Sequence, residues 1–378
     1  MSDARAGLYL HVPFCHAKCE YCDFYSLTQL DQIEAFTGAL LTELELRAPK
    51  GEGVTFDTVF FGGGTPSLLS DDQLGRIWET IHRHYHIAAD AEISLESNPG
   101  TLDLPKLRFM RGLGINRLSM GVQSFHPEEL KRLGRIHTVA EVLENVGNAR
   151  RAGFDNLNLD LMTAFPGITP DSFAASLDAA IELAPEHISC YTLIFEPGTI
   201  LYKRMERGET APLSDEEEAG YYRTAAERLG AAGYEQYEIS NFARGRERRC
   251  RHNLTYWRHV PYLGLGPSAH SYWEGRRFAN PRSLARYIKT LNEGRLPVDF
   301  EERLTSEQVM FEYMFLNLRL REGIDLGEFR ERFGEDLRER FAPALGELTA
   351  RNLIELNDDR LRLSPEGWLM ADAVAACF

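Results

Sequence analysis

The feature that most constrains this 378-residue chain is an alternation of strand-like and helix-like segments over its first two thirds. Short β-rich runs lie at 8–12, 57–61, 92–96, 116–122, 155–161 and 187–195, with a weaker one at 234–239. Between them apolar residues recur at helical spacing, as Leu74, Ile77 and Ile81 do. This alternation predicts right-handed βαβ units around a parallel sheet. Six or seven units indicate a full or partial (β/α) barrel, with its functional site at the C-terminal ends of the strands.

The pattern changes after residue 240. Residues 241–282 are rich in Arg, Tyr, Trp, Gly and Pro and lack clean periodicity, so we interpret them as a connecting segment. Residues 283–378 have a mostly helical pattern, and their tail indicates a helix, a short hairpin around 357–359 and another helix. We therefore predict a barrel at 1–240 and, after the connecting segment, a mostly helical, winged-helix-like domain at 283–378.

Charge and composition exclude several classes of protein. The 57 acidic and 42 basic residues give a formal net charge of −15, and an acidic chain is a poor non-specific binder of nucleic acid. No apolar run reaches the roughly 18–20 residues of a spanning helix, and positions 1–14 lack the apolar core of a signal peptide. Six cysteines are too few for a disulfide scaffold. We therefore expect a cytoplasmic protein without a nucleic-acid role.

Three of the cysteines, Cys15, Cys19 and Cys22, follow the first strand with the spacing C-x3-C-x2-C. Structural zinc normally takes four ligands, and a [4Fe–4S] cluster is usually held by four thiolates. Three close cysteines without an obvious fourth predict a cluster with one open iron, which can bind a ligand. Zinc with His11 or His16 as the fourth ligand, and unligated thiols, are the alternatives.

A glycine run, Gly62–Gly64, follows the second strand and precedes Thr65 and Pro66. Glycines let backbone groups approach a ligand closely, although a tight strand-to-helix turn is the simpler interpretation. Phosphate binding is disfavoured because no Gly-Lys-Ser/Thr follows.

The cysteine spacing, with the aromatic Tyr21 before the last cysteine, resembles the radical S-adenosylmethionine (SAM) enzymes. The resemblance implies a partial (β/α)6 barrel in which the three cysteines bind three irons and the methionyl group of SAM chelates the fourth. It also implies that the glycine run holds the methionyl amine. One electron, from an electron donor, would then cleave SAM to a 5′-deoxyadenosyl radical.

A narrower resemblance covers essentially the whole chain. The segments 9–15, 61–67, 96–100, 116–125, 133–137 and 158–162 resemble the oxygen-independent coproporphyrinogen III oxidases and the related haem chaperones of the HemW type. The resemblance implies a SAM pocket lined by Tyr9, Tyr21, Gly63, Gly64, Thr65, Glu96, Gln123, Arg135, Asp160 and Ile194.

The residue types fit this pocket. Glu96, Gln123 and Asp160 lie near predicted strand ends, where they can meet ribose hydroxyls and the methionyl amine. Arg135 could pair with the methionyl carboxylate. Ordinary polar loop residues are the alternative for each. The run Thr-Ala-Phe-Pro-Gly at 163–167 departs from the Tyr-Gly-Leu-Pro-Gly-like run that is more common in the family.

Two differences favour the chaperones over the oxidases. The oxidases carry a fourth cysteine two residues after the third, where this chain has Phe24, and they have a long extension where only 14 residues precede Cys15. The sequence His-Asn-Leu-Thr-Tyr-Trp at 252–257 matches the HNxxYW motif of the chaperones, which is associated with haem. We predict a haem site formed by His252, Asn253, Tyr256 and Trp257.

The chemistry of this motif suits haem. Histidine is a common axial ligand of haem iron, and aromatic rings can stack on the macrocycle. Five arginines and one glutamate at 244–251 give a local charge of +4, and arginine pairs well with carboxylates such as the haem propionates. A structural histidine and a solvated basic loop are the alternatives. Among the remaining cysteines, Cys190 is predicted to be a core residue, and Cys250, among arginines, to have a lowered thiol pKa.

The resemblance thus implies a haem chaperone with a [4Fe–4S] cluster, SAM and haem. It would deliver haem to acceptor haemoproteins such as respiratory enzymes, some of them membrane-bound, and transient membrane contact follows from that. The alternative function is an oxygen-independent coproporphyrinogen III oxidase, which forms protoporphyrinogen IX. The sequence predicts no oligomeric state.

Overall fold

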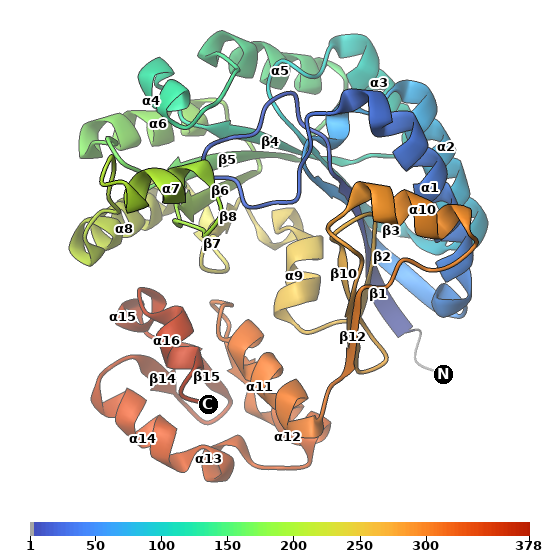
Figure 1. The fold of residues 1–378 in the computed structure, drawn as a ribbon. Coiled ribbons are helices and arrows are strands. Elements are labelled where there is room, and N and C mark those ends of the chain that lie inside the picture. Colours follow the sequence, from blue (N-terminus) through green and yellow to red (C-terminus); the bar gives the residue numbers. More distant parts are fainter. Residues whose placement is uncertain (1–3) are drawn as a thin grey trace.

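The computed structural model describes residues 4–378. Six parallel strands form the centre of a twelve-stranded sheet in the order β12-β11-β10-β9-β1-β2-β3-β4-β5-β6-β8-β7. These six are β1 (Ala4–Val12), β2 (Val54–Gly63), β3 (His86–Ser97), β4 (Arg117–Gln123), β5 (Leu157–Thr163) and β6 (His187–Thr192). The predicted partial barrel is therefore confirmed, because the sheet curves without closing (Figure 1).

Helices cover the outer face of the parallel strands (Figure 1). They are α1 (Ile33–Arg47), α2 (Asp71–His84), α3 (Leu104–Leu113), α5 (Val139–Arg151), α6 (Pro170–Glu182) and α8 (Asp215–Ala231). Two shorter helices, α4 (Pro127–Arg132) and α7 (Ile200–Glu206), lie in the segments after β4 and β6, and Leu201 N–H of α7 donates to Glu20 O of the cysteine loop at 2.9 Å. Local sequence determines where several begin. Ser70, Thr138, Thr169 and Ser214 each accept a hydrogen bond from the backbone N–H three residues later and form a capping box there.

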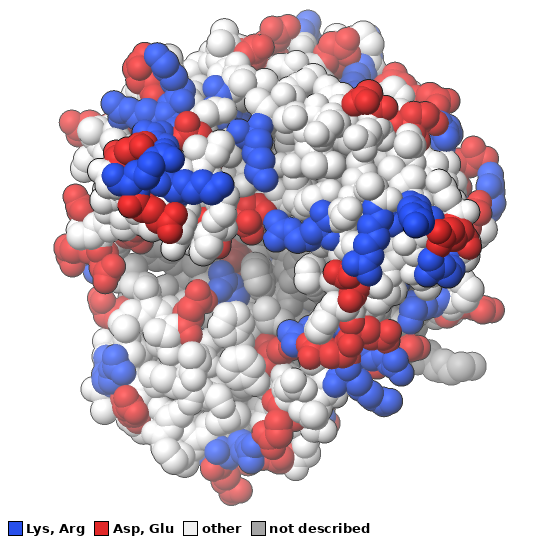
Figure 2. Space-filling view, in the orientation of Figure 1, with Lys and Arg blue, Asp and Glu red and all other residues white. Residues whose placement is uncertain are grey.

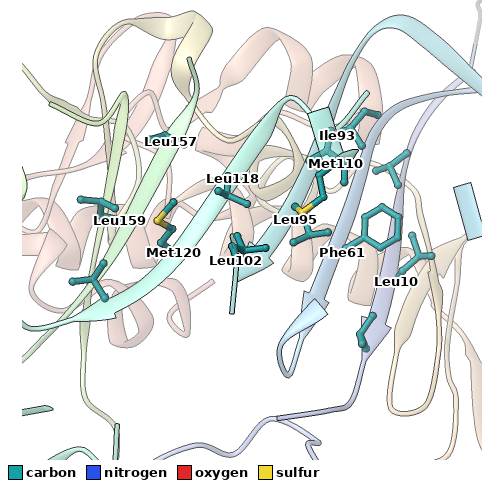
Figure 3. Packing of buried hydrophobic residues seen from close by; sticks show 14 of the residues in the cluster. Leu10, Phe61, Ile93, Leu95, Leu102, Met110, Leu118, Met120, Leu157 and Leu159 are labelled. Carbon is teal, nitrogen blue, oxygen red and sulfur yellow. The ribbon is translucent and has the colours of Figure 1, made fainter. Parts of the chain in front are cut away.

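The alternation of residues along each strand separates the core from the concave face. Leu8, Leu10 and Val12 of β1 are fully buried in the hydrophobic core, as are Leu157 and Leu159 of β5. Figure 3 shows Leu10, Leu95, Leu118 and Leu159 in this packed layer. Because successive side chains of a strand point to opposite faces, the intervening polar residues lie on the concave face. Tyr9, His11, Glu96 and Asp160 are therefore placed inside the half-barrel.

The sheet continues beyond residue 240, where we predicted the barrel to end. On one edge, β7 (Glu235–Gln236) and β8 (Asn241–Ala243) pair antiparallel next to β6. Only two residues of the run at 234–239 form a strand, and this strand pairs with β8 rather than with β6. On the other edge, β9 (Tyr262–Leu265) pairs parallel with β1, and β10 (His270–Trp273), β11 (Arg276–Ala279) and β12 (Phe300–Arg303) follow antiparallel.

Two further helices belong to this part of the molecule: α9 (Arg251–Trp257) and α10 (Leu284–Asn292). Helix α10 packs against α1, and its residues Leu284, Tyr287 and Leu291 share the main core. By sheet and core membership, the first unit therefore extends to β12 rather than ending at 240 or 282. The predicted connecting segment 241–282 lies largely within it.

A second core belongs to the C-terminal unit, whose described buried residues begin at Met310. Its elements are α11 (Ser306–Asn317), β13 (Ile324–Asp325), α12 (Leu326–Phe333), α13 (Leu337–Arg340), α14 (Ala342–Ala350), β14 (Ile354–Leu356), β15 (Arg360–Leu363), α15 (Pro365–Trp368) and α16 (Ala371–Ala375). The hairpin β14–β15 and its flanking helices confirm the winged-helix-like pattern. The unit lies beside the open side of the sheet, and Figure 2 shows a hollow between the two bodies, with charges of both signs spread over the face.

Within residues 4–378, no helix combines the length and the apolar character that a membrane crossing requires.

Candidate functional site

The loop after β1 brings three cysteines to the C-terminal end of the sheet, where it crosses the mouth of the half-barrel (Figure 1). Its two ends are held together, because Cys15 N–H donates to Leu27 O at 2.9 Å and Leu27 N–H donates to Pro13 O at 2.6 Å. Within the loop, Cys22 N–H donates to Cys19 O at 3.3 Å. The three thiols are partly accessible.

Two donors point at these sulfurs. The Thr65 hydroxyl lies 3.4 Å from Cys15 Sγ, and Arg135 Nη1 lies 3.4 Å from Cys19 Sγ. Burial, with a smaller contribution from neighbouring cysteines, raises the pKa of Cys15 and raises that of Cys22 to about 11. Thiolates clustered here therefore require added positive charge, which a metal centre supplies. The donor set, three cysteines with hydrogen-bond donors around them, fits an iron–sulfur cluster.

His11 is not free to complete a zinc site. Its Nε2 lies 2.8 Å from Tyr25 O, and its Nδ1 lies 3.0 Å from the Tyr9 hydroxyl. The side chain is buried, and burial lowers its pKa to about 4, so it is neutral and hydrogen-bonded on both sides. His16 is exposed. In residues 4–378, no group of three His, Cys, Asp or Glu is arranged around a single ion. In a [4Fe–4S] cluster each cysteine sulfur binds a different iron. The three cysteines can therefore lie further apart than the ligands of a single metal ion.

The glycine run packs directly under the cysteine loop. A Cβ atom on Gly63 would lie 2.5 Å from the His11 ring, and one on Gly64 would lie 2.6 Å from Phe14 O. Gly63 also has a φ of +108°, which side chains rarely adopt. These contacts explain the glycines by close packing. The turn is also hydrogen-bonded to the cysteine loop, because Gly64 N–H donates to Val12 O at 2.8 Å and Thr65 N–H donates to Phe14 O at 2.7 Å.

Carboxylates line the concave face beside this turn. Gly63 N–H donates to Glu96 Oε2 at 3.1 Å. Burial, and then the nearby Asp160, raise the pKa of Glu96 to about 7. Asp160 accepts hydrogen bonds from Asn158 Nδ2 at 2.7 Å and from the Ser119 hydroxyl at 3.2 Å, while burial raises its pKa. Tyr9 also lies here, since a Cβ on Gly62 would touch both Tyr9 and Glu96.

Arg135 lies nearer the cysteines than we expected for a partner of the methionyl carboxylate. It donates to Cys19 Sγ, to Gly121 O at 2.7 Å and to the side chain of Asn98. Tyr21 also lies against Arg135 and Cys19. The guanidinium is therefore already engaged by the protein on several sides.

Asn98 was absent from our predicted set. Its Nδ2 donates to Thr65 Oγ1 at 2.8 Å, and its Oδ1 accepts from Arg135. It thus links the turn after β2 to the residue that contacts Cys19. Its place just beyond the end of β3, two residues after Glu96, was the available signal.

The remaining predicted residues differ in how they face the site. Gln123, with a φ of +68°, is the last residue of β4. Its side-chain amide and the Arg135 guanidinium lie close together, since a Cβ atom on Gly121 would contact both. Ile194 follows β6 and is 66% exposed, so it lies at the rim. In the variant run at 163–167, Ala164 has a φ of +56°, which accounts for the glycine that is more common there.

The HNxxYW motif forms α9, and its histidine is inside the half-barrel. His252 is 1% exposed and stacks on Phe60, with ring centroids 4.9 Å apart. Its Nδ1 lies 2.7 Å from the Thr58 hydroxyl and its Nε2 lies 2.8 Å from the Tyr256 hydroxyl. Backbone N–H groups of Arg251 and His252 donate to Glu92 of β3. Asn253 lies half-buried on the same helix.

Three of the five arginines at 244–251 are paired with acidic residues. Arg249 lies 3.1 Å from Glu235, and Arg248 lies 3.8 Å from Asp155. Arg251 lies within 4 Å of Asp57 and Asp90. Acidic residues from other segments therefore offset much of the local positive charge. Cys250 corrects a further expectation, because it is buried and burial raises its thiol pKa to about 12.

Comparison with known proteins agrees with the resemblance. The model of the radical SAM superfamily matches residues 9–180, and that of the HemN C-terminal domain matches residues 304–370. The second match begins where the large sheet ends.

Several similar whole proteins are heme chaperones named HemW. The heme chaperone HemW of Bacillus subtilis is 36% identical over 98% of both chains. That of Mycobacterium tuberculosis is 39% identical over 97% of this chain and 93% of the relative. Among solved structures, the radical SAM enzyme coproporphyrinogen III oxidase (HemN) of Escherichia coli has a TM-score of 0.87 at 25% identity, covering 99% of this chain and 90% of the other.

Proposed function

The chain belongs to the heme chaperone HemW family of the radical SAM superfamily, and from this membership we propose that it binds haem and transfers it to acceptor haemoproteins. The observation that supports this most is similarity over the full length of chaperones of that name, including both the half-barrel and the C-terminal unit. Respiratory enzymes, including membrane-bound ones, are the proposed acceptors, and delivery to them would be cytoplasmic, with transient membrane contact.

We propose that Cys15, Cys19 and Cys22 hold a [4Fe–4S] cluster. The Thr65 hydroxyl would donate to the first thiolate and Arg135 to the second, which stabilises the negative charge of the sulfurs. When SAM is bound to the reduced cluster, the pair supplies a 5′-deoxyadenosyl radical. A separate electron donor would be required.

The concave face would hold SAM. Glu96 and Asp160 carry the carboxylates suited to the methionyl amine and ribose hydroxyls, beside the glycine turn. Tyr9, Tyr21, Gly63, Gly64, Thr65, Gln123, Arg135 and Ile194 complete the proposed pocket. Within this set Arg135 would hold the cysteine loop as well as the cofactor.

A second candidate is the oxygen-independent coproporphyrinogen III oxidase reaction. Its support is the structural match to coproporphyrinogen III oxidase over nearly the whole chain. Phe24 at the position of the oxidases' fourth cysteine weighs against it, and this side chain is 68% exposed.

An anaerobic assay of the reconstituted protein separates the two candidates. The chaperone proposal expects saturable haem binding and transfer to an apo-haemoprotein, with no conversion of coproporphyrinogen III to protoporphyrinogen IX. Conversion at a rate comparable to a genuine oxidase control would replace the chaperone proposal with the oxidase.

A further inference from the structure

A cavity of about 650 Å³ lies on the other side of the HNxxYW helix from the cofactor pocket. It is bounded by the end of α9, by β9 to β11 and by α11 of the C-terminal unit, which packs beside α9. A volume of this size is typical of pockets for ligands larger than a single amino acid. Two residues of the motif, Tyr256 and Trp257, line it.

The walls are aromatic on both sides. Tyr256, Trp257, Tyr262 and Tyr272 come from the half-barrel, and Phe311 and Phe315 come from α11. Tyr256 and Tyr262 meet edge to face with centroids 4.6 Å apart. Aromatic walls that face each other across a gap suit a large flat ring system, which can stack on them and leave its polar edge in water.

Polar groups gather at one end of the same cavity. His259 is 5% exposed and stacks on Tyr272 at 4.2 Å. Its Nδ1 accepts from Arg332 at 2.9 Å, and its Nε2 lies 3.3 Å from Glu312. Arg277 lies 2.7 Å from the other oxygen of Glu312. Both ring nitrogens of His259 are hydrogen-bonded, so the groups of this cluster that suit haem are its guanidinium groups, which can bind a carboxylate in exchange for Glu312.

The indole N–H of Trp257, which also lines the cavity, has no hydrogen-bond acceptor within residues 4–378. This N–H is buried, and buried donors in native proteins are rarely left unpaired. His252, in contrast, has both ring nitrogens occupied and faces Phe60 and Thr58 on the opposite side of α9.

We infer that haem binds in this cavity between α9 and α11, and not on His252. The inference rests on the proposed haem function and places its site. In this arrangement Tyr256 and Trp257 contact the macrocycle, while His252 positions Tyr256 through the hydrogen bond between them. The C-terminal unit supplies one wall, so haem binding depends on both units of the chain.

The test is a haemin titration of the full-length, anaerobically purified protein, followed by Soret absorption and tryptophan quenching. Phe311, 44% exposed on α11, is changed to glutamate, and Leu143, 51% exposed on α5, receives the same change as a matched control. We expect Phe311→Glu to weaken haemin binding at least tenfold and Leu143→Glu to leave it unchanged. Leu316→Trp, which narrows the cavity without adding charge, should weaken it as well.

The possible outcomes distinguish failure of the proposed haem site from failure of the proposed haem function. If wild type binds haemin saturably and both cavity variants bind equally well while remaining folded by circular dichroism, the cavity is not the site. If wild type itself shows no saturable binding, the proposed function fails. Equal loss in Leu143→Glu would mean that haemin binds to apolar surface in general, which also overturns the inference.

Discussion

Nδ1 of His252 and the hydroxyl of Thr58 lie 2.7 Å apart, although 194 residues separate them in the chain. This contact ties α9 to β2, and the stacking of the imidazole on Phe60 reinforces it. Burial lowers the pKa of His252 to about 3, so the ring is neutral. We therefore propose that the motif histidine is a positioning residue that holds the segment bearing Tyr256 and Trp257 against β2.

His252→Ala should destabilise the fold rather than remove an iron ligand. Losing a buried ring and leaving the Thr58 hydroxyl unpaired is expected to lower the free energy of unfolding by about 2–4 kcal/mol. Urea denaturation at pH 7.5 measures this, with the exposed His86→Ala as control. Loss of haem binding at unchanged stability would contradict this role.

The loss of unfolding free energy caused by His252→Ala should become smaller at acidic pH. The folded-state pKa lies below the ordinary value of about 6.5, so protons bind the unfolded chain preferentially. The stabilisation is full above pH 6.5 and is lost as the pH falls towards 3. Between pH 6.5 and 5 the difference in unfolding free energy between wild type and variant should narrow by about 2 kcal/mol. If the difference in unfolding free energy stayed constant across this range, the pKa of His252 would not be lowered by burial.

The strands and helices of the half-barrel could be predicted from the sequence, because the spacing of apolar residues differs clearly between a strand and a helix. Glu96 and Asp160 were predicted from the family resemblance, and their position near predicted strand ends agreed with it. The segment 241–282 could not be predicted, because its strands have three or four residues and β9 pairs with β1 across some 250 positions. The orientation of His252 could not be predicted either. The same HNxxYW sequence is compatible with a histidine that faces Thr58 and with one that faces a ligand.

Cys19→Ser should lose the cluster. After anaerobic reconstitution, iron and acid-labile sulfide are expected to fall well below half of the wild-type content, because only two thiolates remain. The exposed Cys377→Ser, outside the loop, should retain the wild-type content. A preparation of wild type that holds only zinc and resists iron would refute the cluster itself.

Arg135→Gln should shift the reduction potential of the cluster to more negative values. The guanidinium donates to Cys19 Sγ, and hydrogen bonds and positive charge near the sulfurs favour the reduced state. A lost charge-assisted hydrogen bond corresponds to roughly 50 mV or more for one electron. Redox titration by electron paramagnetic resonance measures the shift. Arg132→Gln removes a nearby charge that donates to Gly167 O instead, so its shift should be clearly smaller.

SAM binding should tighten as the pH rises through neutrality. Burial, and then Asp160, raise the pKa of Glu96 to about 7, and only the ionised carboxylate attracts the methionyl amine. Between pH 6 and 8 the ionised fraction rises roughly tenfold, and the affinity measured by equilibrium dialysis should follow it. Glu96→Gln should remove this dependence and bind at the weaker, low-pH level throughout. Asp160→Asn should move the midpoint to lower pH, because it removes the charge that opposes ionisation of Glu96. A pH profile of Glu96→Gln that matches wild type would show that another group controls binding.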